Sequence, residues 1–115
     1  MKFKNLFATS LLIATANSNA ANLAALEICA SKSITQLANL SVITTRESST
    51  GAEIVMRESV YNAVVQSEKS GGDMYDNLAL ALSMAKMCWV EKDNSAKGIR
   101  VDIVTQSGLL LVSGR

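Results

Sequence analysis

The chain of 115 residues contains no histidine and no proline. Histidine is the commonest general base near neutral pH and the commonest ligand of zinc. Its absence removes the usual means of acid–base catalysis and of zinc binding, so the sequence favours a protein that is not an enzyme. Because proline is also absent, no slow refolding phase limited by prolyl isomerisation is expected.

Aromatic residues and excess charge are also scarce. Two of the five aromatic residues, Phe3 and Phe7, lie at the amino-terminal end, which leaves Tyr61, Tyr75 and Trp89 for the rest of the chain. Three rings are too few for the stacking platforms that bind single-stranded nucleic acid. The 11 basic and 10 acidic residues nearly cancel, so no basic field is available for nucleic acid or an anionic membrane. We therefore expect no nucleic-acid partner.

The first twenty residues have the three-part layout of a secretory signal peptide. Lys2 and Lys4 give a positive start, and residues 6–16 form an apolar run that is too short to span a membrane. Ser18 and Ala20 are small residues at the two positions that a signal peptidase reads. We therefore expect cleavage after Ala20.

Cleavage would divide the chain into a signal peptide, residues 1–20, and a single mature domain, residues 21–115. The 95 remaining residues are enough for one modest hydrophobic core. Two lysines and no acid are lost, so the formal net charge changes from +1 to −1. No second long apolar run follows. We expect no stable membrane anchor after cleavage and a periplasmic or secreted location.

The only two cysteines, Cys29 and Cys88, both lie in the mature part. An even number of cysteines in a short exported chain favours a disulfide, although two buried reduced thiols are the alternative. A bridge closing a loop of about 60 residues contributes roughly 4 kcal/mol on the chain-entropy model.

Three segments have apolar residues at the three- and four-residue spacing of amphipathic helices. We expect helices over about residues 22–40, 50–69 and 73–90. Thr50 and Glu53 fit a capping box at the start of the second helix, and Asp73 is the expected cap of the third. The β-branched run 42–45, followed by the polar residues 46–49, favours a loop over residues 41–49, with a short extended piece as the alternative.

The pattern changes after the third segment. Alternation over residues 99–103 indicates a half-buried strand, and the apolar run 109–112 indicates a second strand. Ser107 and Gly108 supply a turn between them. We therefore expect a β-hairpin at about residues 98–113.

Together these elements predict a mainly α fold, a three-helix bundle with a C-terminal β-hairpin. Cys29 falls on the first expected helix and Cys88 on the third. One disulfide would therefore staple these two helices together.

The third expected helix is apolar on two sides. One stripe contains Met74, Leu78, Ala81, Leu82, Ala85 and Trp89. Leu80, Met84 and Met87 form a second stripe on the opposite side. A helix of this kind either lies at the centre of its fold or docks against another molecule, so these three residues are our candidate partner-binding residues.

The sequence offers no catalytic residue, no cofactor motif and no metal site of ordinary ligand spacing. Our first hypothesis is a small exported non-enzymatic binding protein, of the inhibitor or immunity kind, that acts on another protein in the periplasm. The alternative is a structural homo-oligomer of the cell envelope, with the second stripe and residues 109–112 buried between copies. An enzyme is the weakest hypothesis, together with copper binding through the thioethers of Met56, Met74, Met84 and Met87.

Amino-terminal sequencing of the protein from its native extract should begin Ala-Asn-Leu, because cleavage is expected after Ala20. The intact mass under non-reducing conditions should be two hydrogens below the mass after reduction. A mature protein that keeps Met1, or a mass that reduction leaves unchanged, would contradict the export assignment or the bridge respectively.

Overall fold

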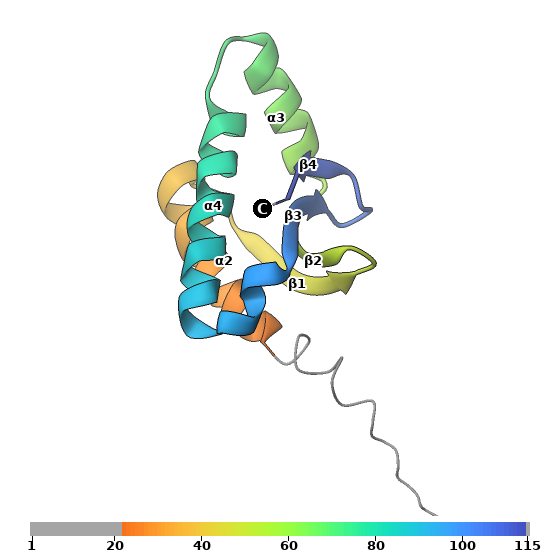
Figure 1. Ribbon diagram of the computed structural model, residues 1–115. Coiled ribbons are helices and arrows are strands. Elements are labelled where there is room, and N and C mark those ends of the chain that lie inside the picture. The colour runs from red at the N-terminus through yellow and green to blue at the C-terminus, as the bar shows by residue number, and fades with distance from the viewer. Residues whose placement is uncertain (1–21, 115) are drawn as a thin grey trace, which may run out of the picture.

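The computed structural model describes residues 22–114, so the predicted signal peptide lies outside the described residues. The described chain forms, in order, helix α2 (Leu23–Ala38), strands β1 (Val42–Ser48) and β2 (Gly51–Met56), helices α3 (Ser59–Lys69) and α4 (Met74–Lys92), the short 3-10 helix η2 (Asn94–Gly98), and strands β3 (Arg100–Thr105) and β4 (Leu110–Val112) (Figure 1).

The four strands form one mixed sheet in the order β1-β2-β3-β4. β1 and β2 are antiparallel, β2 and β3 are parallel, and β3 and β4 are antiparallel. Parallel neighbours need a long crossover connection. Helices α3 and α4 and the 3-10 helix η2 supply this crossover between β2 and β3.

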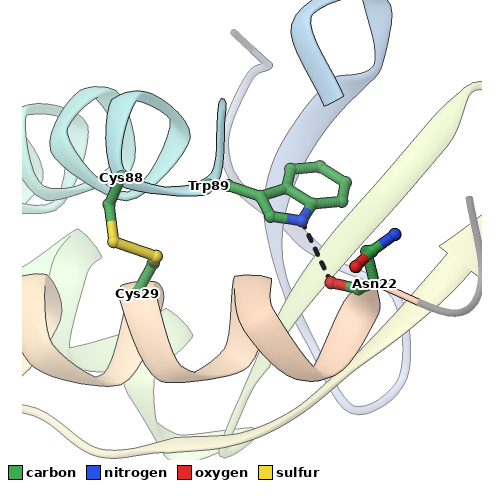
Figure 2. The surroundings of a disulfide bond; sticks show 4 residues. All are labelled: Asn22, Cys29, Cys88 and Trp89. Carbon is green, nitrogen blue, oxygen red and sulfur yellow. Dashed lines mark hydrogen bonds between the residues drawn. A yellow bond between two sulfur atoms is a disulfide. The ribbon is translucent and has the colours of Figure 1, made fainter. Parts of the chain in front are cut away.

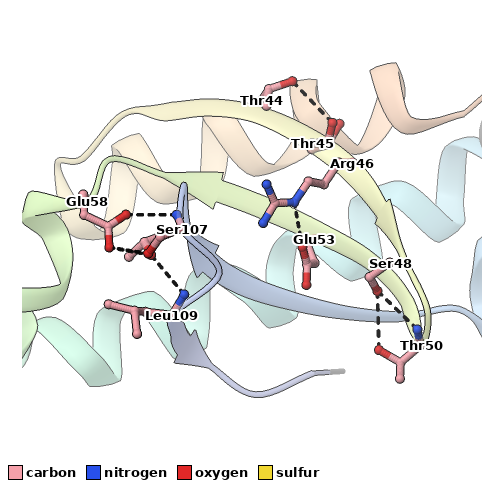
Figure 3. Close-up of polar contacts among 10 residues, drawn as sticks. Thr44, Thr45, Arg46, Ser48, Thr50, Glu53, Glu58, Ser107 and Leu109 are labelled. Carbon is pink, nitrogen blue, oxygen red and sulfur yellow. Dashed lines mark hydrogen bonds and ion pairs between the residues drawn. The ribbon is translucent and has the colours of Figure 1, made fainter.

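Helices α2 and α4 lie on one face of the sheet. Figure 3 looks onto the opposite face, with the helices behind the strands. The core between the two layers contains the buried residues Leu26, Cys29, Ala30 and Ile34 of α2; Ala52, Ile54 and Met56 of β2; Leu78, Ala81, Leu82, Ala85 and Trp89 of α4; Val101 and Ile103 of β3; and Leu111 and Val112 of β4. The two layers therefore share a single hydrophobic core.

The expected three-helix bundle is wrong, because the domain is a two-layer α/β structure. Residues 51–56 were expected to begin the second helix, but they form β2. Ala52, Ile54 and Met56 are buried against the helices, a period-2 pattern that only a strand can produce. A capping box stabilises a helix by about 1 kcal/mol. This is less than the free energy gained when the apolar side chains of a strand between β1 and β3 are buried.

The second helix is correspondingly shorter than expected and begins at Ser59. Val60 and Val64 of this helix are buried in the core, whereas Tyr61 is exposed. α3 therefore contacts the core through one side of its first half.

The segment expected to be a loop at residues 41–49 is also a strand, β1. The β-branched residues that argued against a helix are the residue types that strands favour. At the other end of the chain β3 and β4 do pair antiparallel. They form half of the four-stranded sheet and not a separate hairpin on a bundle.

Gly51 opens β2 immediately after the turn from β1. Its φ of +152° lies in a region that side chains rarely adopt, and a Cβ atom there would collide with the carbonyl oxygen of Arg100. The glycine therefore lets β2 approach β3 at the first residue of their parallel pairing.

The Cys29–Cys88 disulfide predicted from the sequence is confirmed (Figure 2). It joins α2 to α4 with a Cα–Cα distance of 5.7 Å and closes a sequence separation of 59 residues. Beside it, the indole N–H of Trp89 donates to the carbonyl oxygen of Asn22 at 3.0 Å. A disulfide of this kind is compatible with an exported protein in an oxidising compartment.

Cys88→Ser should lower the free energy of unfolding by about 4 kcal/mol, because the unfolded chain regains the entropy of the open loop. The melting temperature should then fall by roughly 20 °C. Thermal melts of the variant and of the reduced wild type should agree with each other. If the variant and the oxidised wild type melt alike, the bridge contributes nothing to stability.

Candidate functional site

Helix α4 has one buried side and one exposed side. Leu78, Ala81, Leu82, Ala85 and Trp89 are fully buried in the core. Leu80, Met84 and Met87 keep 52%, 41% and 66% of their surface exposed. Because they recur at four- and three-residue spacing, they lie together on the helix side that points away from the sheet. We call these three residues the outer stripe.

Charged residues border the outer stripe along the helix axis. Asp76 lies one turn before Leu80, and Glu91 lies one turn after Met87, and both side chains are exposed. The stripe is therefore an apolar surface with a carboxylate at each end.

A groove of about 370 Å³ lies beside the end of the outer stripe, where η2 passes α4. It is lined by Lys86, Met87, Val90, Glu91 and Lys97. The Lys86 ammonium donates to the carbonyl oxygen of Ile99 at 2.7 Å, and burial lowers the pKa of this lysine below its ordinary value. The groove thus combines an apolar floor with two lysines and one carboxylate.

Lys97 is the exposed cation of this groove. Within residues 22–114 its ammonium has no ion-pair partner, because the two ion pairs found there join Arg46 to Glu53 and Arg100 to Asp102. A carboxylate bound at this position would therefore not have to displace an acid of residues 22–114.

Two carboxylates lie next to each other on the face of the sheet that points away from α2 and α4. They belong to Glu53 of β2 and Asp102 of β3, which are register partners. Each has its own guanidinium, with Arg46 at 2.7 Å from Glu53 and Arg100 at 3.2 Å from Asp102 (Figure 3 shows the first pair). Like charges directly opposite each other destabilise a sheet, and the two arginines offset this repulsion. The arrangement is a neutral network across the strands and does not resemble an acid and base in a cleft.

A second polar cluster ties the β3–β4 turn to the start of α3. The carboxylate of Glu58 accepts hydrogen bonds from the Ser107 amide at 3.0 Å, the Ser107 hydroxyl at 2.6 Å and the Thr105 hydroxyl at 3.2 Å (Figure 3). These donors, above all the Ser107 hydroxyl, lower the pKa of Glu58 below its ordinary value. A carboxylate held in its charged form is a weak base, so the cluster positions the turn and does not activate Ser107 as a nucleophile.

A second cleft, of about 360 Å³, lies at the end of the sheet where the β1–β2 turn meets the start of α2. Its lining consists of Leu23, Glu47, Ser48, Thr50, Gly51, Ala52, Trp89, Gly98 and Ile99. The hydroxyls of Ser48 and Thr50 hydrogen-bond to each other, and Glu47 is the one titratable group in the lining. One carboxylate beside two mutually bonded hydroxyls does not form a catalytic set.

The methionines considered for copper do not converge. Met56 is fully buried in the sheet, whereas Met84 and Met87 lie on the opposite, outer side of α4. In the part of the chain that the structure describes, no three His, Cys, Asp or Glu side chains form a metal-binding group. No helix within residues 22–114 is both long enough and apolar enough to cross a bilayer.

Comparison of the chain with protein-family models, curated proteins and solved structures finds no significant match.

Sequence reasoning identified the outer stripe but missed the groove beside it. Lys97 and Val90 come together only because η2 folds back along α4, and no spacing in the sequence signals this return. Ile28 of α2, which is 65% exposed, was also missed. Its signal was available, since it falls outside the apolar stripe of its helix.

The Glu58 cluster predicts a pH-dependent stability. Because the pKa of Glu58 is lower in the folded protein than the ordinary 4.5, the carboxylate adds stability that is present above about pH 4.5 and is lost as the pH falls through the folded value. Urea midpoints of the wild type should therefore fall on acidification below that pH.

In Glu58→Gln this acid-dependent part should be absent, and the variant should be less stable than the wild type at neutral pH. Glu68→Gln, in an exposed position on α3, is the matched control and should follow the wild-type profile. Parallel pH profiles for the wild type and Glu58→Gln would contradict the assignment.

Proposed function

We propose that this chain is a small exported binding protein without enzymatic activity, of the inhibitor or immunity kind, which acts by protein–protein interaction in the periplasm. The observation that carries the proposal is the outer stripe, which exposes Leu80, Met84 and Met87 on a helix whose other side is entirely buried.

The composition of the stripe suits an interface. Contiguous apolar surface rimmed by polar groups marks interaction sites on soluble proteins, and methionine adapts its flexible side chain to the shape of a partner. The stripe lies on a helix that a disulfide holds against its neighbour. A partner would therefore meet a rigid surface and lose little conformational entropy in ordering it.

The groove at the end of the stripe supports a partner of particular chemistry. Met87 and Val90 can receive an apolar side chain, while Lys97 and Lys86 border the same space. The complementary ligand is a helical segment of another protein that presents apolar side chains next to a carboxylate. This partner would place its acid beside Lys97, away from Glu91.

The homo-oligomeric alternative has less support on this surface. An antiparallel pair of α4 helices from two copies would bring Asp76 of one copy near Glu91 of the other, both of which are exposed acids. Of the C-terminal strand residues, Leu111 and Val112 are buried in the core of their own chain, and only Leu109 and Leu110 are exposed.

The periplasmic location belongs to this proposal. Its supports are the signal-peptide pattern of residues 1–20 and the disulfide, because thiols in most cytosolic proteins are kept reduced.

The test uses the mature, oxidised protein as bait in a periplasmic extract of its source. Wild type should recover one stoichiometric protein, and Met84→Glu combined with Met87→Glu should lose it, because charges on the stripe cannot be buried. Lys97→Glu should weaken the same complex and reduce its dependence on salt. Tyr61→Glu, an exposed site on α3, is the control and should bind as the wild type does.

A complex that survives the double substitution on the stripe would overturn the proposed surface. Recovery of no partner, or of proteins that bind all four variants equally, would overturn the proposed function itself.

A further inference from the structure

The cleft at the start of α2 contains a carboxylate without a cation. Its lining, to which Leu23 and Glu47 both belong, has no lysine or arginine. Neither of the ion pairs found within residues 22–114 involves Glu47. On β1, Glu47 lies opposite Ala52, a residue of the core, so its side chain starts from the face of the sheet that α2 covers. The carboxylate is therefore placed to receive a cation at the beginning of this helix.

Two hydrogen bonds fix the direction in which α2 crosses β1. The Thr44 hydroxyl donates to the Glu27 carboxylate at 3.3 Å, and the Thr45 hydroxyl donates to the carbonyl oxygen of Leu23 at 3.0 Å. Moving backward along α2 therefore corresponds to moving forward along β1. Glu47 is two residues beyond Thr45 and on the same face of the strand, so the start of α2 points toward Glu47.

Asn22 is held firmly at this start. Its carbonyl oxygen accepts the backbone N–H groups of Ala25 and Leu26 at 3.1 and 3.2 Å, and the indole N–H of Trp89 at 3.0 Å (Figure 2 shows the indole bond). Consecutive Cα atoms are about 3.8 Å apart. After the expected cleavage only Ala21 precedes Asn22, so the new amino terminus is one residue away from an anchored position.

The start of α2 also lacks a negative charge of its own. The amino-terminal end of a helix carries a partial positive charge, and the first turn of α2 contains no acidic residue. An α-ammonium group at this end adds a second positive charge. Glu47, the carboxylate of the adjoining cleft, can offset both.

We propose that the α-ammonium group of Ala21, which removal of the signal peptide exposes, binds in this cleft and pairs with the Glu47 carboxylate. The inference rests on the expected cleavage after Ala20 and not on the proposed function. In the uncleaved chain the same nitrogen belongs to an uncharged amide, so the pair forms only once the signal peptide has been removed.

The pair would have a consequence for the order in which the fold is completed. The Cys29–Cys88 disulfide, which joins α2 to α4, forms in an oxidising compartment. The pair between Ala21 and Glu47 joins the start of α2 to β1 and follows cleavage. Two of the links that hold α2 in place are then completed only after export.

The experiment compares two oxidised chains that differ only in where they begin. One begins at Ala21 and the other at Asn19, so both carry one α-ammonium group and the same net charge. The chain that begins at Ala21 should melt about 2–5 °C higher at low salt, the range expected of a partly exposed ion pair in a domain of this size. The difference should shrink at high salt. It should disappear in Glu47→Gln and persist in Glu68→Gln, the matched control on α3.

The reactivity of the amino terminus gives a second measurement, which does not depend on folding stability. Pairing with a carboxylate raises the pKa of an α-amino group above its ordinary value of about 7.7–8.0, and only the uncharged amine reacts with acylating reagents. Glu47 is the one titratable group among the residues that α2, β1, β2, α4 and η2 contribute to the cleft. At neutral pH the Ala21 amine should therefore be acylated about two- to fivefold faster in Glu47→Gln than in the wild type.

Equal melting temperatures of the two chains would overturn the inference, and so would a difference that Glu47→Gln leaves intact. A native protein that begins at a residue other than Ala21 would also overturn it, through the cleavage site and not through the cleft.

Discussion

The disulfide between Cys29 and Cys88 is the contact on which the arrangement of the helix layer depends. It joins two helices that are distant in sequence and that together cover one face of the sheet. The hydrogen bond from the Trp89 indole to the Asn22 carbonyl oxygen adds a second link between α4 and the start of α2. For a domain this small, a bridge closing so long a loop contributes free energy comparable to the net stability of many whole domains. The same bridge makes the exposed surface of the helix pair rigid.

This rigidity matters because the proposed function depends on an exposed surface of α4. Glu53 and Asp102 pair with guanidinium groups on the sheet, and Glu58 accepts hydrogen bonds from hydroxyls and an amide at the β3–β4 turn. Three of the exposed apolar side chains, Leu80, Met84 and Met87, lie together on the outer side of α4. We assign this surface to a partner protein.

The prediction of a helix over residues 50–69 shows where local reasoning fails in this chain. Thr50 and Glu53 have the right types and spacing for a capping box, but the box describes only the ends of a helix. The alternation of Ala52, Ile54 and Met56 was equally present in the sequence. This alternation could be assigned to a strand only from its parallel partner β3, which lies about fifty residues further along the chain. In the same way the groove beside Met87 forms only because the chain at Lys97 passes back beside α4.

The sequence by itself determined the two long helices, the two-sided character of α4 and the pairing of the cysteines, because periodicity and residue count are local or compositional properties. The absence of histidine likewise limited the chemistry before any fold was considered. The tertiary structure alone decided that the middle of the chain forms a sheet, that the outer stripe stays exposed, and that one seven-residue strand edge is open. These features depend on contacts between residues far apart in the chain, whose energies outweigh local propensity and leave no mark in local spacing.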